Sequence, residues 1–212
     1  MNTNRPIRLT LLTLMLTAVL AAPSFGATVL HRNVVDMIEL SELIIVGTVS
    51  EVTDGFDQNG VPYTEITVNV KETIRGNQGA TYTFRQFGLL APRDMGNGKI
   101  NLNTTLDGWP SFKTDQEVTL FLYQAGAITG FRTTVGLLQG KFDSRGEMLS
   151  NAINNRGLFD NMEIDTQLLS AAEQKLIAST EGPMNRETFV AFVRKVVAQN
   201  WIETGKVSNA KN

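Results

Sequence analysis

The chain has 212 residues, of which 42% are hydrophobic, 8% aromatic and 19% charged, with one histidine and no cysteine. Without cysteine, the sequence excludes disulfides, thiolate zinc sites, thiol nucleophiles and a lipidated N-terminal cysteine. One imidazole leaves no multi-histidine metal site and a single side chain for proton transfer near neutral pH. The apolar fraction is normal for a folded protein, so the composition favours a globular chain with few reactive groups.

The N-terminus has the pattern of an export signal. Residues 1–8 carry two arginines and no acid, and an uncharged, Leu-rich run extends from Leu9 to Ala22. The small residues Ser24 and Gly26 suit cleavage before Ala27. A transmembrane anchor, the alternative, needs about 20 apolar residues, which is longer than this run. We therefore expect a cleaved signal peptide and a periplasmic or secreted bacterial protein.

The charge balance opposes a nucleic-acid partner. The whole chain has 19 basic and 21 acidic residues, and without the two arginines of residues 1–8 the count is 17 against 21, a net charge near −4. Nucleic-acid binders carry a basic footprint instead. We expect no cofactor, no metal ion, no nucleic acid and no membrane association after cleavage.

The first elements after the signal form a helix and a hairpin. Asn33 is placed to cap a short helix over residues 33–42. Residues 43–52 are β-branched and almost continuously apolar at first, as in a strand buried on both faces. Residues 54–60 contain Asp-Gly and Asn-Gly pairs typical of a turn, and residues 63–74 then alternate strictly between apolar and polar side chains.

The chain then continues as a β domain with one long irregular loop. Residues 80–87 are predicted to form a third strand, and residues 117–123 a short one. Residues 88–115 lack periodicity, and loops of this length are usually functional or mobile. Residues 131–142 are predicted to form a long strand that turns back into residues 147–151. Its two internal glycines predict bends that let a small sheet curl into a barrel.

The C-terminal part is predicted to be helical. Helical spacing indicates a helix within residues 165–179, and Asn185 caps a second one, with Met184 and Phe189 as a hydrophobic staple. The expected organisation is a signal peptide, a β-barrel domain, an Asn-rich linker, a helical appendage and a disordered tail. The corresponding ranges are 1–26, 27–151, 152–164, 165–204 and 205–212.

Four stretches that cover most of residues 33–151 resemble a group of uncharacterised bacterial exported proteins: Glu42–Val52, Tyr63–Gly76, Gln116–Tyr123 and Val135–Asp143. The order and lengths of these strands are also similar to the OB-like netrin domain of tissue inhibitors of metalloproteinases. This resemblance implies a mainly β (α+β) fold. It would be a five- to six-stranded antiparallel Greek-key barrel with a short N-terminal helix and a two-helix C-terminal appendage.

The inhibitor resemblance also implies a mechanism that this chain cannot share. Those inhibitors place an N-terminal, disulfide-bonded cysteine on the zinc ion of a protease, whereas this chain has no cysteine and is expected to begin at Ala27-Thr28. What remains is an exposed N-terminal segment, residues 27–32, that meets a partner. The single imidazole, His31, lies in this segment. We expect it to be a contact residue, because a catalytic base also needs an orienting carboxylate and a nucleophile.

The long loop is the stronger candidate for a contact surface. Trp109 and Phe112 are large aromatic residues in a polar, Gly-rich stretch, and Phe87 lies just before it. Exposed loop aromatics often anchor a partner. The alternative is that they fold back and cap the barrel. The candidate binding residues are Trp109, Phe112, Phe87, Ala27, Thr28 and His31.

Other motifs are weaker. Residues 54–60 resemble a calcium loop but lack its terminal bidentate glutamate, so a turn is favoured. No spacing selects a pair of carboxylates. The leading hypothesis is an exported, non-enzymatic binding module for a protein partner, with a secreted protease as the candidate. The alternatives are a carboxylate-based hydrolase acting on envelope polysaccharide, and a small-ligand or sugar-binding carrier with an apolar pocket.

Overall fold

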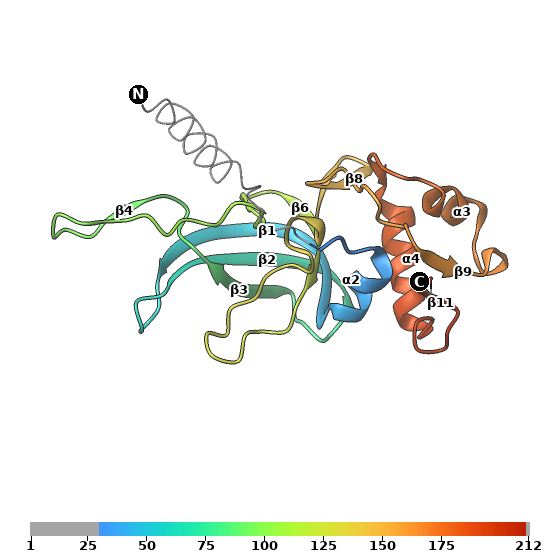
Figure 1. Ribbon diagram of the computed structural model, residues 1–212, viewed down its shortest axis with the longest axis horizontal. Coiled ribbons are helices and arrows are strands. Elements are labelled where there is room, and N and C mark those ends of the chain that lie inside the picture. The colour runs from blue at the N-terminus through green and yellow to red at the C-terminus, as the bar shows by residue number, and fades with distance from the viewer. Residues whose placement is uncertain (1–29, 211–212) are drawn as a thin grey trace, which may run out of the picture. The chain divides into compact units, whose positions relative to one another are not determined.

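The central element is strand β1 (Leu43–Phe56), which pairs antiparallel with β2 (Pro62–Arg75) on one side and with β6 (Glu117–Leu122) on the other (Figure 1). The computed structural model describes residues 30–210. The predicted signal peptide, Ala27 and Thr28 lie outside the described residues. From His31 onward the chain forms one unit.

The fold is mainly β, as predicted, but the large sheet is open. Its seven strands run in the order β10-β8-β7-β6-β1-β2-β3, and all its ladders are antiparallel. The order β6-β1-β2-β3 is that of a Greek key. No ladder closes the sheet into a barrel within residues 30–210, so the predicted five- to six-stranded closed barrel is not found. The remaining strands are β3 (Thr81–Phe87), β4 (Arg93–Asp94), β5 (Ile100–Asn101), β7 (Lys141–Arg145), β8 (Met148–Asn151), β9 (Met162–Ile164), β10 (Met184–Asn185) and β11 (Val207–Asn209).

Residues 131–142 do not form the long strand that the sequence predicts. Gly136 and Leu137 have φ angles of 63° and 57°, which break an extended backbone. A short 3-10 helix, η1 (Leu137–Gln139), follows them. The preceding residues still bridge two strands, because Arg132 N donates to Arg85 O of β3 at 2.7 Å and Tyr123 N, beside β6, donates to Thr133 O at 3.1 Å.

Both faces of the central strands are buried. One face packs against the helices α2 (Val34–Leu40) and α4 (Arg186–Ala198), where the rings of Phe142 and Phe189 lie 5.1 Å apart. The other face has a separate apolar cluster. Its buried members are Leu43, Ile45, Val49, Ile66, Val68, Phe84, Phe112, Val118, Leu120 and Leu122. The nearly continuous apolar start of β1 reflects this two-sided burial.

The helix starts follow local sequence signals. Asn33 Oδ1 accepts from Asp36 N at 3.0 Å, and Asn185 Oδ1 accepts from Thr188 N at 2.9 Å, which confirms both predicted caps. Helix α3 (Ala171–Ile177) begins with a capping box between Ser170 and Glu173 and is shorter than predicted. A 3-10 helix, η2 (Thr166–Leu168), precedes it.

The segment predicted as a linker contains buried residues. Within residues 152–164, Leu158 belongs to the helix-side core, and buried Asn155 donates to Leu149 O at 3.0 Å and to Gly182 O at 2.9 Å. The polar end also differs from the predicted disordered tail. There β11 pairs with β9, and Val207 is buried, because this short ladder supplies backbone partners that sequence periodicity does not reveal.

We predict that Gly47→Ala destabilises the protein by about 1–3 kcal/mol, because an added methyl group overpacks β1 against β2. A Cβ at Gly47 would lie 2.4 Å from Asn69 O. Gly79→Ala is the matched control, since a Cβ there meets nothing within 4 Å. Urea unfolding of the purified protein measures both. Equal free energies of unfolding for the two variants would contradict the packing of these strands.

Candidate functional site

Most of the exposed large apolar side chains among the described residues lie on one protruding segment, residues 90–106, here called the arm. It carries β4 and β5 and extends away from the large sheet (Figure 1). Its exposed apolar residues are Leu90 at 53%, Met95 at 45%, Ile100 at 64%, Leu102 at 71% and Leu106 at 50% relative exposure. Clustered exposed apolar side chains mark interaction sites more often than scattered ones do.

The base of the arm is held by β1. The Asp54 carboxylate accepts a hydrogen bond from Leu90 N at 2.8 Å and forms an ion pair with Arg93. Fully buried Leu89 joins the two ends of the arm, since its N donates to Asn103 O and its O accepts from Thr105 N, both at 2.9 Å. These contacts fix where the arm leaves the sheet.

The tip of the arm is polar. Met95 N donates to Lys99 O at 3.0 Å, and the Asp94 carboxylate accepts from Gly96 N at 2.9 Å, which closes the turn between β4 and β5. The tip residues themselves are Gly96, Asn97 and Gly98. Of the five exposed apolar side chains, Met95 lies beside this turn and the other four lie along the length of the arm.

The loop aromatics predicted as contact residues are not the exposed part of this loop. Phe112 is 6% exposed and packs edge-on against Phe84, with ring centroids 5.7 Å apart. Trp109 and Phe87 are half-buried. Pro110 O accepts from buried Gln86 at 2.9 Å, which holds this part of the loop against β3. Phe112 thus follows the alternative of folding back onto the sheet.

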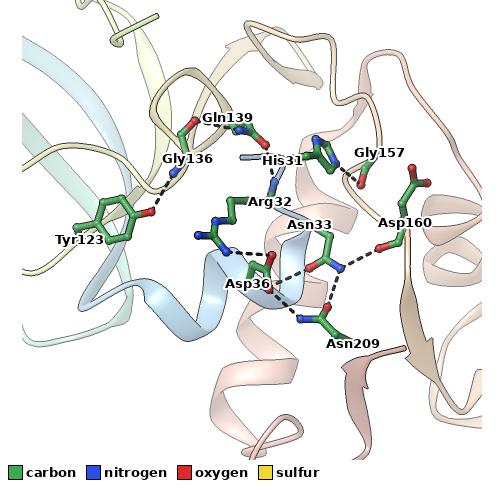
Figure 2. Close-up of polar contacts among 10 residues, drawn as sticks. All are labelled: His31, Arg32, Asn33, Asp36, Tyr123, Gly136, Gln139, Gly157, Asp160 and Asn209. Carbon is green, nitrogen blue, oxygen red and sulfur yellow. Dashed lines mark hydrogen bonds and ion pairs between the residues drawn. The ribbon is translucent and has the colours of Figure 1, made fainter. Parts of the chain in front are cut away.

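A polar cluster attaches the first described residues to the rest of the unit (Figure 2). Asn33 Nδ2 donates to Asp160 O at 2.8 Å and to Asn209 Oδ1 at 2.7 Å. Asn209 Nδ2 in turn donates to Asp36 Oδ1 at 2.8 Å. The cluster, which we call the clasp, links α2 to β11 near the other end of the chain.

His31 is exposed and makes a hydrogen bond beside the clasp. Its Nε2 is 3.0 Å from Gly157 O, and Arg32 N donates to Gln139 Oε1 at 2.8 Å (Figure 2). Gly157 has a φ of 65°, and a Cβ there would lie 2.5 Å from the imidazole Nε2, so a larger residue would displace the ring from this position. The ring is hydrogen-bonded to a backbone carbonyl, which holds the imidazole beside Gly157.

The carboxylates that face α4 are held in ion pairs. Glu72 forms two hydrogen bonds with Arg194, at 2.5 and 2.8 Å, which lower the pKa of its carboxyl group. Glu117 lies between Lys71 and Arg186, and its hydrogen bond with Lys71 is the main cause of its lowered pKa. A glycosidase acid needs a raised pKa. This geometry therefore gives the hydrolase hypothesis no support from Glu72 and Glu117.

The turn that resembles a calcium loop directs its carboxylates to backbone groups. Asp57 Oδ1 accepts from Asn59 N and Val61 N, each at 2.8 Å, and Asp54 holds the arm. Within residues 30–210, no group of three or more histidines and carboxylates is placed to hold a metal ion. No helix in that same part of the chain is long and apolar enough to cross a membrane.

Comparisons of the chain with protein-family models, curated proteins and solved structures find no match. The candidate site therefore rests on its geometry. The arm brings together exposed aliphatic residues that the sequence interpretation passed over in favour of Trp109 and Phe112. The available signal was the set of large aliphatic residues in a loop otherwise rich in glycine and polar side chains.

We predict that Asp54→Asn loosens the arm without unfolding the sheet. Hydrogen bonds to charged groups contribute about 1.5–3 kcal/mol, so the amide of Leu90 should exchange about tenfold faster or more. Asp94→Asn, at the tip, is the control and should leave Leu90 unchanged. Hydrogen–deuterium exchange resolved by residue makes the comparison. Unchanged exchange at Leu90 in Asp54→Asn would mean that Asp54 does not anchor the arm.

We predict that Asn33→Ala lowers the free energy of unfolding by about 2–3 kcal/mol, since it removes a helix cap and two hydrogen bonds. Asn33→Asp keeps the capping oxygen but loses both Nδ2 donors, so it should be intermediate. Asn77→Ala, in an exposed turn, is the control. Chemical unfolding measures the free energy of unfolding of each variant. A value for Asn33→Ala equal to or above that for Asn77→Ala would contradict the stabilising role of the clasp.

Proposed function

We propose that this chain is an exported, OB/netrin-like binding module that contacts a protein partner through the arm. The observation that carries the proposal is the set of five exposed apolar side chains on one segment whose base is fixed by Asp54 and Leu89. A fixed base lowers the ordering cost of binding, and aliphatic side chains supply the buried area.

The distribution of side chains on the arm favours a protein over a lipid surface. A membrane-inserting hairpin needs several apolar residues at its tip, whereas here Met95 alone adjoins a Gly-Asn-Gly turn that is flanked by the charged Asp94 and Lys99. The net charge of −2 for the whole chain gives no general attraction to anionic lipid. A partner lying along the side of the arm can contact both Ile100, in β5, and Leu102, just after it, because both side chains are exposed.

The backbone of the arm offers a second means of attachment. Among the described residues, β4 and β5 pair only with each other, so each has a free edge. A partner strand that adds to such an edge gains main-chain hydrogen bonds, while Ile100 and its neighbours give side-chain specificity. The resemblance to netrin-like inhibitors supports a secreted protease as the partner class. In this chain, which has no cysteine, the arm would make the contact with the protease.

The Greek-key order of β6-β1-β2-β3 supports the OB-like part of the proposal. A further support is that residues 131–134 contact both β3 and β6, the two sides that a closed barrel would join. The N-terminal segment, with Ala27 and Thr28, remains part of the proposed contact surface. His31, within that segment, is hydrogen-bonded to Gly157 O at 3.0 Å.

We predict that Ile100→Asn combined with Leu102→Asn reduces capture of the partner from periplasm or medium by tenfold or more, because both side chains belong to the contact. Ile128→Asn is the control, since Ile128 is 98% exposed but lies outside the arm. Both variants should have the same urea midpoint of unfolding as the wild-type protein.

Urea unfolding should distinguish the two loop aromatics, Trp109 and Phe112. Trp109→Ala is expected to keep the fold, whereas Phe112→Ala destabilises it by about 3–5 kcal/mol through the lost contact with Phe84. Equal capture by wild type and the Ile100→Asn, Leu102→Asn variant, with the fold intact, would exclude the arm as the contact surface.

A further inference from the structure

An apolar groove lies between α3, the start of α4 and the β8–β10 edge of the sheet, apart from the arm. Its volume is about 460 Å³, within the range of about 300–1,000 Å³ that is typical of small-molecule sites. Its lining residues are Met148, Ala172, Lys175, Leu176, Ser179, Pro183, Met184, Asn185 and Thr188. The groove is thus built from three separate parts of the chain.

The walls of the groove are mostly hydrophobic. Met148 is 41% exposed, which is high for a large apolar side chain, and Ala172 and Pro183 are also exposed. Leu176 and Met184 are buried and form part of the helix-side core, so the groove has a firm apolar base. Methionine side chains adapt their shape readily, which suits a flexible apolar ligand.

Among the described residues, Lys175 is the only charged side chain that lines the groove. Lys175 makes no ion pair with any residue in the range 30–210, although Lys195, on α4, pairs with Glu173 at 3.0 Å. Asn185, the N-cap of α4, also lines the groove, but its side-chain oxygen already accepts from Thr188 N and Glu187 occupies the same first turn, so the positive charge of the groove comes from Lys175. A locally positive apolar groove in a chain of net charge −2 is complementary to an anionic amphiphile.

A second groove on the same unit differs in charge. It has a volume of about 390 Å³, and its lining includes Lys71, Glu72, Glu117, Arg186 and Glu187, whose charges largely neutralise one another. The cations of this groove are already paired, because Lys71 and Arg186 both form ion pairs with Glu117. The second groove therefore offers no unpaired cation to an anionic ligand.

We propose that the groove beside α3 binds a free fatty acid. The acyl chain lies on Met148, Leu176 and Met184, and the carboxylate lies near Lys175. Burial of the chain drives binding, and the charge-assisted hydrogen bond with the ammonium group orients it. The groove is too small for a docked protein helix, because stable protein interfaces bury about 800 Å² on each partner.

The test is binding of laurate and of its uncharged analogue dodecanol to the mature protein, by displacement of 11-(dansylamino)undecanoic acid. Laurate is expected to bind saturably with one molecule per chain and at least tenfold more tightly than dodecanol. Lys175→Glu and Met148→Asp should each weaken laurate binding by tenfold or more. Amide shifts in nuclear magnetic resonance spectra should be confined to α3, the start of α4 and β8.

Matched controls exist on the arm. Met95→Asp and Lys99→Glu make the same chemical changes at exposed arm residues, with Met95 at 45% exposure, and should leave laurate affinity unchanged. The Ile100→Asn, Leu102→Asn variant should also bind laurate normally, so this inference and the proposed protein contact fail separately. No saturable binding, or equal effects of Lys175→Glu and Lys99→Glu, would overturn the proposal. A preference for dodecanol would overturn it as well.

Discussion

Burial of β1 on both faces is the constraint on which the rest of the structure depends. Ile44 faces the cluster beneath α2 and α4, whereas Leu43 and Ile45 face the opposite cluster. A shift of one residue in the pairing of β1 would exchange these side chains between the two cores. Pairing with β2 and β6 on either side fixes the register, and with it the positions of both helices and of the Phe84–Phe112 contact.

The same strand connects the core to the candidate contact surface. The first half of β1 is buried, and its second half continues beyond the core as a hairpin with β2. Asp54 lies on that outer half, where its carboxylate holds Leu90 and Arg93. The arm therefore starts from a strand that is itself fixed by two apolar clusters. This arrangement allows aliphatic residues to be exposed on a segment with a defined base, instead of on a loose loop.

Features set by neighbouring residues could be predicted from the sequence. Asn33 and Asn185 accept hydrogen bonds three residues ahead, so both caps are visible in the local pattern. The alternation in β2 likewise reports directly which side chains are buried. Features set by distant residues were missed. Phe112 and Ile100 lie in the same irregular stretch, and only the packing of Phe112 on Phe84 decides which of the two is exposed.

The errors at the ends of the β region have the same origin. Residues 131–142 have strand-like composition, but the left-handed backbone at Gly136 and Leu137 interrupts them. Whether a sheet closes depends on hydrogen bonds between distant edges, which no local pattern contains. The clasp is another example, since Asn33 and Asn209 are separated by 176 residues. Neither asparagine has a sequence context that indicates the other.

The most direct test of the arm as a contact surface is site-specific photo-crosslinking in cells that express the full chain. A photoreactive phenylalanine analogue at Leu102 should give one discrete adduct with another protein, and the same analogue at Ile128, exposed but outside the arm, should give none. Ile100→Asn in the Leu102-labelled chain should remove the adduct. No adduct at Leu102, or identical adducts from Leu102 and Ile128, would contradict the account.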